Sequence, residues 1–284
     1  MKAAIPRARP GPRRERIRAW GRGAASVGVL GVILALSLAP VTLMIVWSLR
    51  DGASILFEFW ALPRWPRWSN YGAALGVLLG PMTRTLYVAG VSILATTVFS
   101  CLAAYAFARL KFFGKETLFY GVLFVLLVPS VLTLTPSFVL AVGLGLRNTL
   151  EGLILFYVGG SQAFSIFLLR AFFQSQPEEI FEAARLDGAS EARMVWSIAA
   201  PLATSILITV GIMNFLTIYN DFIWPLLMLI SRDLYTVNIV LQATGGDRAR
   251  MMAGYVVASI PLLIVFVYGM DYYIDGLATN ALRA

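Results

Sequence analysis

Six stretches of this chain are apolar over a length sufficient to cross a lipid bilayer, and this feature constrains the fold more than any other. A membrane-spanning helix needs about 20 mostly apolar residues. Only 13% of the residues in the chain are charged, whereas a soluble domain has about 25%. We therefore predict an all-α polytopic membrane protein with six transmembrane helices. The six stretches cover about residues 24–49, 86–108, 117–143, 149–173, 199–230 and 252–275.

The distribution of basic residues predicts how these helices are oriented. Eight of the 23 Lys and Arg residues lie in the first 22 positions, directly before the first apolar stretch. If all six stretches span the membrane, 15 basic residues lie on the side of the two termini and eight lie on the other side. Because cytoplasmic loops are enriched in Lys and Arg, both termini are predicted to be cytoplasmic. Residues 1–23 then form a basic cytoplasmic tail before the transmembrane domain of residues 24–284, and the net charge of +8 indicates topology rather than nucleic-acid binding.

A tryptophan-rich loop precedes the second predicted span. It contains Trp60, Trp65 and Trp68, and the predicted topology places it outside the cell. Tryptophan side chains favour the interface between membrane and water. We expect this loop to lie along the outer surface of the membrane.

The residue inventory excludes several kinds of catalytic site. The chain contains no histidine, which removes histidine–metal sites, His-based nucleophile triads and the H-E-x-x-H motif. Its single cysteine, Cys101, cannot form an intramolecular disulfide. Asp221 and Asp271 are predicted near opposite membrane faces, so they cannot form the facing pair of an intramembrane aspartyl protease. We predict that the chain is not an enzyme and has no cofactor or metal of its own.

A charged segment lies between the fourth and fifth predicted spans, on the cytoplasmic side. Pro177 suits the first position of a helix, and Glu178 and Glu179 follow in the first turn, where negative charge is favourable. Gly188 is a natural helix terminator, and Ser190 can cap a second helix that leads into the fifth span. Residues 177–188 are therefore predicted to form a short helix, joined to the next helix by a glycine turn.

This short helix presents side chains suited to contact with another protein surface. Ile180, Phe181 and Ala184 share one face at helical spacing. The helix is too polar to enter lipid and, at about 11 residues, too short to be stable alone. Its partner surface is either the cytoplasmic end of its own bundle or another subunit, and the spacing does not decide between them. The small and acidic side chains available to such a partner are Ala183, Ala184, Glu182 and Asp187.

The same segment resembles the signature of ABC-importer permeases, which reads E-A-A, three residues, G, nine residues, I-x-L-P. The chain departs from it at Ala200, where leucine is usual. The resemblance implies a coupling helix that inserts into a groove on a separate ATPase subunit, which binds ATP and Mg. A separate ATPase agrees with the lack of a G-x-x-x-x-G-K-[ST] phosphate loop in this chain. The matching residues are Glu182, Ala183, Ala184, Gly188, Ile198 and Pro201, and the implied coupling residues are Glu182, Ala183, Ala184, Asp187 and Gly188.

Two further segments resemble the carbohydrate branch of this family, the maltose-type permeases. They are YNDFIWPLL, from Tyr219 to Leu227, and DGLATNALRA, from Asp275 to Ala284. The resemblance covers about residues 70–284 and matches the shorter, six-span member of the maltose-type pair. It implies an importer of a sugar or oligosaccharide in the lipid of a bacterial or archaeal cell (inner) membrane. The implied partners are a second, related permease, two ATPase subunits and an extracellular solute-binding protein.

The sequence leaves the cargo and the energy source open to two alternatives. The coupling signature is shared by importers of other solutes, such as a polyamine or a phosphate ester. An ion-coupled secondary transporter is the other alternative, and it requires titratable groups near the membrane midplane. The chain does not clearly have such groups.

Polar residues within the predicted spans are candidates for a substrate pathway, because lipid cannot satisfy their hydrogen bonds. Asn214 lies deep in the fifth span, where it could instead make an interhelical hydrogen bond, and Gln162 interrupts the fourth span. Asn220 and Asp221 lie near the outer end of the fifth span, and Asp221 could equally be a solvated charge at a helix end. Trp224 is expected in the aromatic belt at the outer interface.

Overall fold

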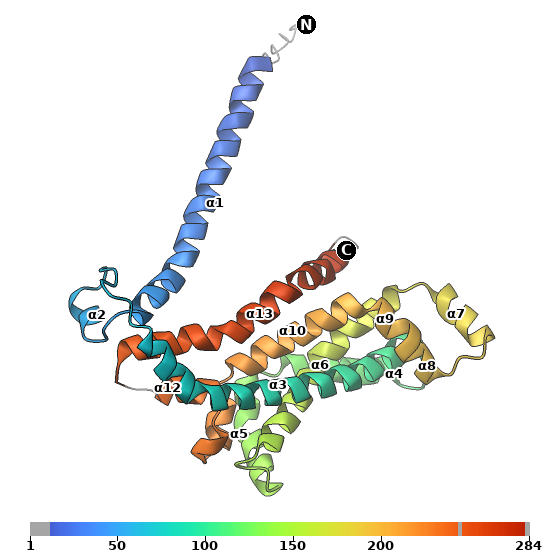
Figure 1. Ribbon diagram of the computed structural model, residues 1–284. Helices are drawn as coiled ribbons and strands as arrows, with labels where there is room; N and C mark the ends of the chain where they lie inside the picture. Colours follow the sequence, from blue (N-terminus) through green and yellow to red (C-terminus); the bar gives the residue numbers. More distant parts are fainter. Residues whose placement is uncertain (1–11, 244–245, 282–284) are drawn as a thin grey trace, which may run out of the picture.

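The computed structural model describes residues 12–243 and 246–281, and every regular element in these ranges is helical (Figure 1). This confirms the predicted all-α architecture. The long helices are α1 (Pro12–Ser48), α3 (Ser69–Arg109), α4 (Lys115–Leu127), α5 (Ser130–Gly143), α6 (Leu150–Ser175), α10 (Thr204–Asn220) and α13 (Arg248–Ala281). The short ones are α2 (Ser54–Phe57), α7 (Glu178–Leu186), α8 (Glu191–Met194), α9 (Ala200–Leu202), α11 (Ile223–Met228) and α12 (Val237–Ala243), with a π-helical turn over Val195–Ala199 and a 3-10 turn over Arg232–Leu234.

Four uninterrupted helical segments are long and apolar enough to cross a membrane. They are Ser26–Ser48, Ser69–Arg109, Leu150–Ser175 and Arg248–Tyr272. The second of these begins well before the expected start at residue 86, because the helix continues through Pro81. The number of spans in the described ranges rises to six if two strongly bent helix pairs are each one span.

The two bent pairs lie where the sequence predicts continuous spans over 117–143 and 199–230. Lys115–Leu126 and Ser130–Gly143 meet at 99°, and Glu191–Leu202 and Thr204–Asn220 meet at 81°. The first break occurs at Pro129, which has no N–H to donate and pushes Val128 into an extended conformation. In the second pair a π-helical turn precedes Pro201, and the helix resumes after Ala203.

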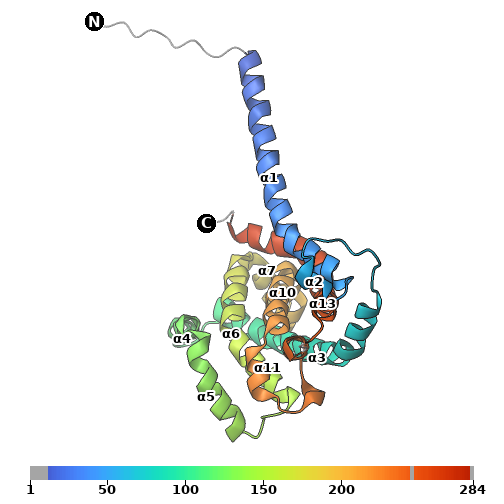
Figure 2. The same cartoon turned by 90° about the vertical axis from the view of Figure 1, so that its left-hand side faces the viewer.

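Helices α3, α6, α10 and α13 form the bundle, as both Figure 1 and Figure 2 show. An outer apolar cluster, which includes Leu78, Tyr219 and Met228, fills the end of the bundle near α11 and α12. An inner cluster, which includes Tyr105 and Phe173, fills the other end and extends to α7. The short helix α7 is therefore attached to a packed core.

Helix α1 stands away from the bundle for most of its length (Figure 1). Every residue from 26 to 42 is exposed, although most of them are apolar. An apolar helix with no protein neighbour is stable only in an apolar solvent, which agrees with a lipid environment.

Candidate functional site

Local sequence chemistry determines where α7 begins and ends. Pro177 occupies its N-cap, and Glu178 and Glu179 lie in its first turn. At the other end the Ala189 N–H donates to the Ala184 carbonyl (2.9 Å) and the Gly188 N–H donates to the Arg185 carbonyl (3.0 Å). This pair of bonds is a Schellman motif, and it requires a left-handed residue, which Gly188 supplies with φ of +78°. The predicted short helix and glycine turn are both present.

The next helix starts immediately after this turn. Ser190 is its N-cap, and its Oγ accepts a hydrogen bond from the Arg193 N–H (3.4 Å). From there the chain runs through α8, the π-helical turn and α9 to α10. Only the short turn around Gly188 separates α7 from α8, where the chain that leads to α10 begins.

The two faces of α7 have different surroundings. Phe181 is 0% exposed and belongs to the inner apolar cluster, against which Ala184 also packs. On the opposite face Glu182 and Ala183 are exposed, and Leu186 is 90% exposed. The helix thus packs on its own bundle through one face and leaves the opposite face exposed. Packing on the bundle is confirmed, whereas docking of the exposed face to another subunit stays a prediction. Asp187 and Gly188 are exposed at the end of the helix.

Arg109, the last residue of α3, fastens α7 to the bundle. Its guanidinium donates to the carbonyls of Phe173 (2.6 Å) and Gln176 (2.5 Å) and forms an ion pair with Glu178. It also lies over the Phe181 ring, 4.3 Å from the ring centroid. One arginine therefore joins the ends of α3 and α6 to the start of α7.

The carboxylate of Glu178 receives a second partner from its own helix. Arg185 donates to its Oε1 at 3.1 Å. Burial alone raises the pKa of Glu178, but the hydrogen bonds from Arg185 and Arg109 and their positive charges outweigh it, so the pKa of Glu178 lies below its usual value. Glu178 is therefore ionised, and the ion pair formed, throughout the neutral range.

Two further hydrogen bonds connect the elements on either side of α7. The Tyr105 hydroxyl on α3 donates to Glu191 Oε2 (2.8 Å), at the start of α8. The Gln176 amide donates to the Ala199 carbonyl (3.1 Å). Sequence reasoning did not assign roles to Arg109, Tyr105 or Gln176, and it treated Glu178 as a helix-dipole group. The only feature of the sequence that pointed to an ion pair was charge. Arg109 is a basic residue at the end of an apolar stretch, and Glu178 is an acidic residue at the start of a polar one.

The pathway candidates within the membrane lie on neighbouring helices. Asn214, on α10, is buried and its amide donates to the Ser165 hydroxyl on α6 (3.3 Å). Gln162 lies one helical turn before Ser165, and its Nε2 is buried without a hydrogen-bond partner among the described residues. Asn220 is exposed and donates to the carbonyl of Leu216 in its own helix (2.8 Å). The structure thus brings Asn214 and Gln162 to the same helix pair and places Asn220 apart from them.

Asp221 ends α10 and organises the turn that follows. Its carboxylate accepts hydrogen bonds from the Tyr157 hydroxyl (2.8 Å) and from the N–H groups of Ile223 (3.0 Å) and Trp224 (3.4 Å). It is therefore a helix-end charge with partners from two elements. The aromatic-belt interpretation of Trp224 is wrong, because this side chain is buried and packs on Phe156 with ring centroids 4.9 Å apart. The break after Asp221 turns the tryptophan toward the outer apolar cluster.

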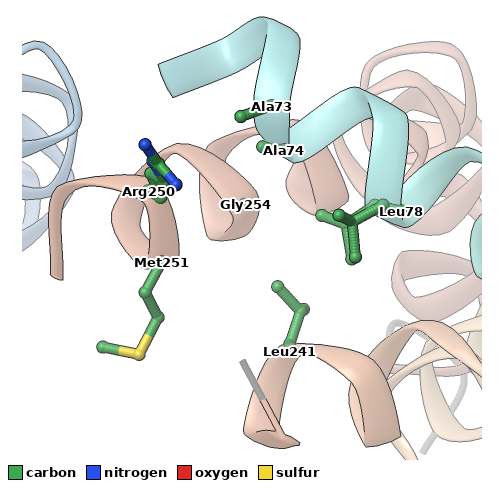
Figure 3. A pocket seen from close by; sticks show the side chains of 8 residues that line it. Ala73, Ala74, Leu78, Leu241, Arg250, Met251 and Gly254 are labelled. Atoms are coloured by element: carbon green, nitrogen blue, oxygen red, sulfur yellow. The ribbon is translucent and has the colours of Figure 1, made fainter. Parts of the chain in front are cut away.

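A cavity of about 150 Å³ lies between α3, α12 and the start of α13 (Figure 3). Leu78 and Leu241 face one another across it. None of the residues predicted as coupling or pathway residues lines it. The lining residues are Ala73, Ala74, Val77, Leu78, Leu241, Arg250, Met251 and Gly254.

Comparison with known proteins identifies relatives over most of the chain. Residues 96–278 match the family described as "Binding-protein-dependent transport system inner membrane component". The putative ABC transporter permease protein ORF2 of Caldicellulosiruptor sp. (strain Rt8B.4) is 31% identical over 250 residues, which are 86% of this chain and 91% of that protein. The diacetylchitobiose uptake system permease protein NgcG of Streptomyces coelicolor is 29% identical over 237 residues, 81% of this chain and 78% of that protein.

A solved structure has the same fold. It is the crystal structure of a bacterial ABC transporter involved in the import of the acidic polysaccharide alginate. One of its chains superposes with a TM-score of 0.80 over 94% of this chain and 100% of that chain, at 22% sequence identity. At this identity the likeness establishes the fold alone.

Proposed function

The chain belongs to the family of binding-protein-dependent transport system inner membrane components, and we propose that it is a permease subunit of an ATP-driven importer for a sugar or oligosaccharide. The observation that carries this proposal is the helix α7, which is held rigidly by one face and exposed on the other. Such a helix can receive force from a second protein and pass it to the membrane bundle.

The exposed face of α7 suits a groove on an ATPase subunit. Leu186 offers an apolar side chain of which 90% is exposed, Ala183 permits close approach, and Glu182 adds a carboxylate for basic groups on the partner. We place ATP and Mg on two such ATPase subunits, because this chain has no phosphate-loop motif. In this arrangement Asp187 and Gly188 lie at the edge of the contact.

The contacts behind α7 support a mechanism of rigid transmission. Arg109 joins α7 to α3 and α6, and the turn at Gly188 joins it to the chain that becomes α10. When the ATPase subunits close, α7 moves and these helices move with it. The permease then needs only two packings of similar free energy, between which ATP and an extracellular solute-binding protein select. A second, related permease completes the transmembrane pathway, and both termini of this chain lie in the cytoplasm.

The substrate class rests on the relatives and on the polar groups within the bundle. NgcG belongs to a diacetylchitobiose uptake system, and the superposed structure belongs to an importer of the polysaccharide alginate. The amides of Gln162 and Asn214 can both donate and accept hydrogen bonds, as sugar hydroxyl groups require. We propose these two as pathway residues, with Asn220 and Asp221 shaping the outer end.

Reconstitution tests the proposed function directly. The chain is incorporated into liposomes with its second permease and the ATPase, and uptake of labelled oligosaccharides is measured with the solute-binding protein outside and ATP at the ATPase. We expect uptake with ATP and none with a non-hydrolysable ATP analogue or without the binding protein. Uptake that persists without the ATPase and follows an ion gradient would refute the ATP-driven mechanism. Uptake of a polyamine or phosphate ester in place of any sugar would refute the substrate class alone.

A further inference from the structure

A loop with many exposed aromatic side chains connects α1 to α3. Within residues 55–68, which we name the outer aromatic loop, all large apolar side chains except Ile55 are exposed to solvent. Phe57 and Trp65 are the most exposed of these, each at 87%. An exposed apolar patch of this kind marks a surface that contacts a membrane or another protein. The exposed members are Leu56, Phe57, Phe59, Trp60, Leu62, Trp65 and Trp68.

The outer aromatic loop is rigid in spite of its exposure, because a buried arginine organises it. The Arg50 side chain is 3% exposed and donates to the backbone carbonyls of Ser54 (3.0 Å), Glu58 (2.7 Å) and Phe59 (3.3 Å). Asn70, also buried, donates to the carbonyls of Ser48 (2.8 Å) and Arg50 (3.0 Å). These bonds tie the Ser54–Phe59 part of the loop to the end of α1, and the Arg67 N–H ties the other end of the loop to the Leu49 carbonyl (2.9 Å).

These hydrogen bonds hold the loop at the end of a membrane span. The apolar part of α1, Ser26–Ser48, has 23 residues, which as a helix reach about 35 Å, slightly more than the hydrocarbon core of about 30 Å. Its last turn is tied to the loop, because the Trp47 Nε1 donates to the Phe59 carbonyl (3.1 Å) and the two rings pack edge to face. Figure 1 shows the loop and α2 beside this end of α1. The loop thus lies at the depth where lipid headgroups begin.

The composition of the loop fits that depth. Tryptophan is enriched at membrane–water interfaces because its ring is apolar and its N–H needs a polar partner. Pro63 and Pro66 have no backbone N–H that would require a hydrogen bond. Arg64 is exposed and forms no salt bridge among the residues that the structure describes, so its guanidinium is available to a phosphate.

We propose that the outer aromatic loop is a rigid anchor that inserts into the headgroup layer of the outer leaflet. Its aromatic side chains, Phe57, Trp60, Trp65 and Trp68, enter the interface, and Arg64 binds lipid phosphate. The anchor fixes the corner between α1 and α3 at the membrane surface while the bundle changes its packing. This inference depends on the membrane location of the chain and not on its cargo.

Site-directed spin labelling of the assembled complex in lipid nanodiscs tests the proposal. Cys101 is the single native cysteine, so Cys101→Ala provides a background in which one label is attached through Trp65→Cys or Phe57→Cys. Val32→Cys, in the exposed apolar part of α1, serves as the lipid reference. Asp233→Cys, exposed on an outer loop, serves as the water reference on the same side. The measurement is the collision rate of each label with oxygen, which concentrates in lipid, relative to a water-soluble nickel complex.

The proposal predicts that labels at positions 57 and 65 have an oxygen-to-nickel ratio several-fold above that of position 233 and closer to that of position 32. Adding the solute-binding protein should leave both ratios unchanged. A ratio equal to that of position 233 would overturn the anchor. The anchor would also be overturned if the nickel complex reaches positions 57 and 65 in the absence of the binding protein and is excluded only after that protein is added. In that case the outer aromatic loop would be a contact surface for the binding protein. Oligosaccharide uptake by each labelled complex is measured in parallel, so that failure of the import function is recognised separately.

Discussion

Gly188→Val tests whether the turn after α7 transmits motion to the bundle. Gly188 has φ of +78°, and no heavy atom lies within 4 Å of the position that its Cβ would take. The substitution therefore adds backbone strain without a clash. The left-handed conformation costs an L-residue about 1–2 kcal/mol, and a β-branched residue is an outlier there. A cost of about 2 kcal/mol lowers the equilibrium constant for forming the native turn about thirtyfold, since 1.36 kcal/mol corresponds to a factor of ten.

The matched control is Gly188→Asn, because asparagine enters the left-handed region with little strain. Complexes with either variant are reconstituted, and solute uptake and ATP hydrolysis are measured in the same vesicles. We expect Gly188→Val to reduce the solute transported per ATP by about tenfold, with the basal hydrolysis rate retained, and Gly188→Asn to stay close to wild type. If the assembled Gly188→Val complex transports at the normal ratio, the turn does not carry the coupling.

Three further predictions follow from the contacts around α7 and within the bundle. Arg109→Ala leaves the Phe173 and Gln176 carbonyls without their side-chain donor and leaves Glu178 with Arg185 alone, so the complex should lose about 2–3 kcal/mol of stability and much of its coupling. Arg109→Lys, which lacks the planar fork, should be intermediate in thermal melts and uptake. Because the pKa of Glu178 is lowered in the folded state from 4.5, its stabilising effect is complete above the pKa of the unfolded chain and is lost as pH falls through the lower folded value. The hydrogen-exchange protection of α7, measured relative to the intrinsic exchange rate at each pH, should therefore fall as the pH drops below 4.5, and Glu178→Gln should remove that dependence. Asn214→Ala and Ser165→Ala break the same hydrogen bond and should lower the melting temperature equally. Only Asn214→Ala should raise the solute concentration that gives half-maximal uptake. If both variants take up solute equally, Asn214 is a packing residue and not a pathway residue.

The sequence is most informative where structure is determined by neighbouring residues. Pro177, Gly188 and Ser190 each specify a helix end through their own backbone or side chain, and the structure has α7 and its turn at these residues. The exposed tryptophans of the loop before α3 were likewise recognisable, because an apolar ring in a short loop has few places to be buried.

Features that depend on distant partners could not be predicted in this way. Arg109 and Glu178 are separated by 69 residues, so only the fold reveals that they form an ion pair. Counting apolar residues over 117–143 also hides the break at Pro129, because an apolar window of sufficient length looks the same whether or not the helix bends. Trp224 was misplaced for a related reason, since the turn at Asp221 redirects its side chain.

Photocrosslinking from the exposed face of α7 tests the central claim most directly. In the Cys101→Ala background, a benzophenone is attached through Leu186→Cys or Ala183→Cys, with Asp233→Cys on the outer side as the control. Irradiation of the transport-competent complex should join the labels at 183 and 186 to the ATPase subunit and leave the label at 233 unjoined to it. If the complex transports its solute while neither α7 label reaches an ATPase, α7 is not the helix through which ATP drives this permease.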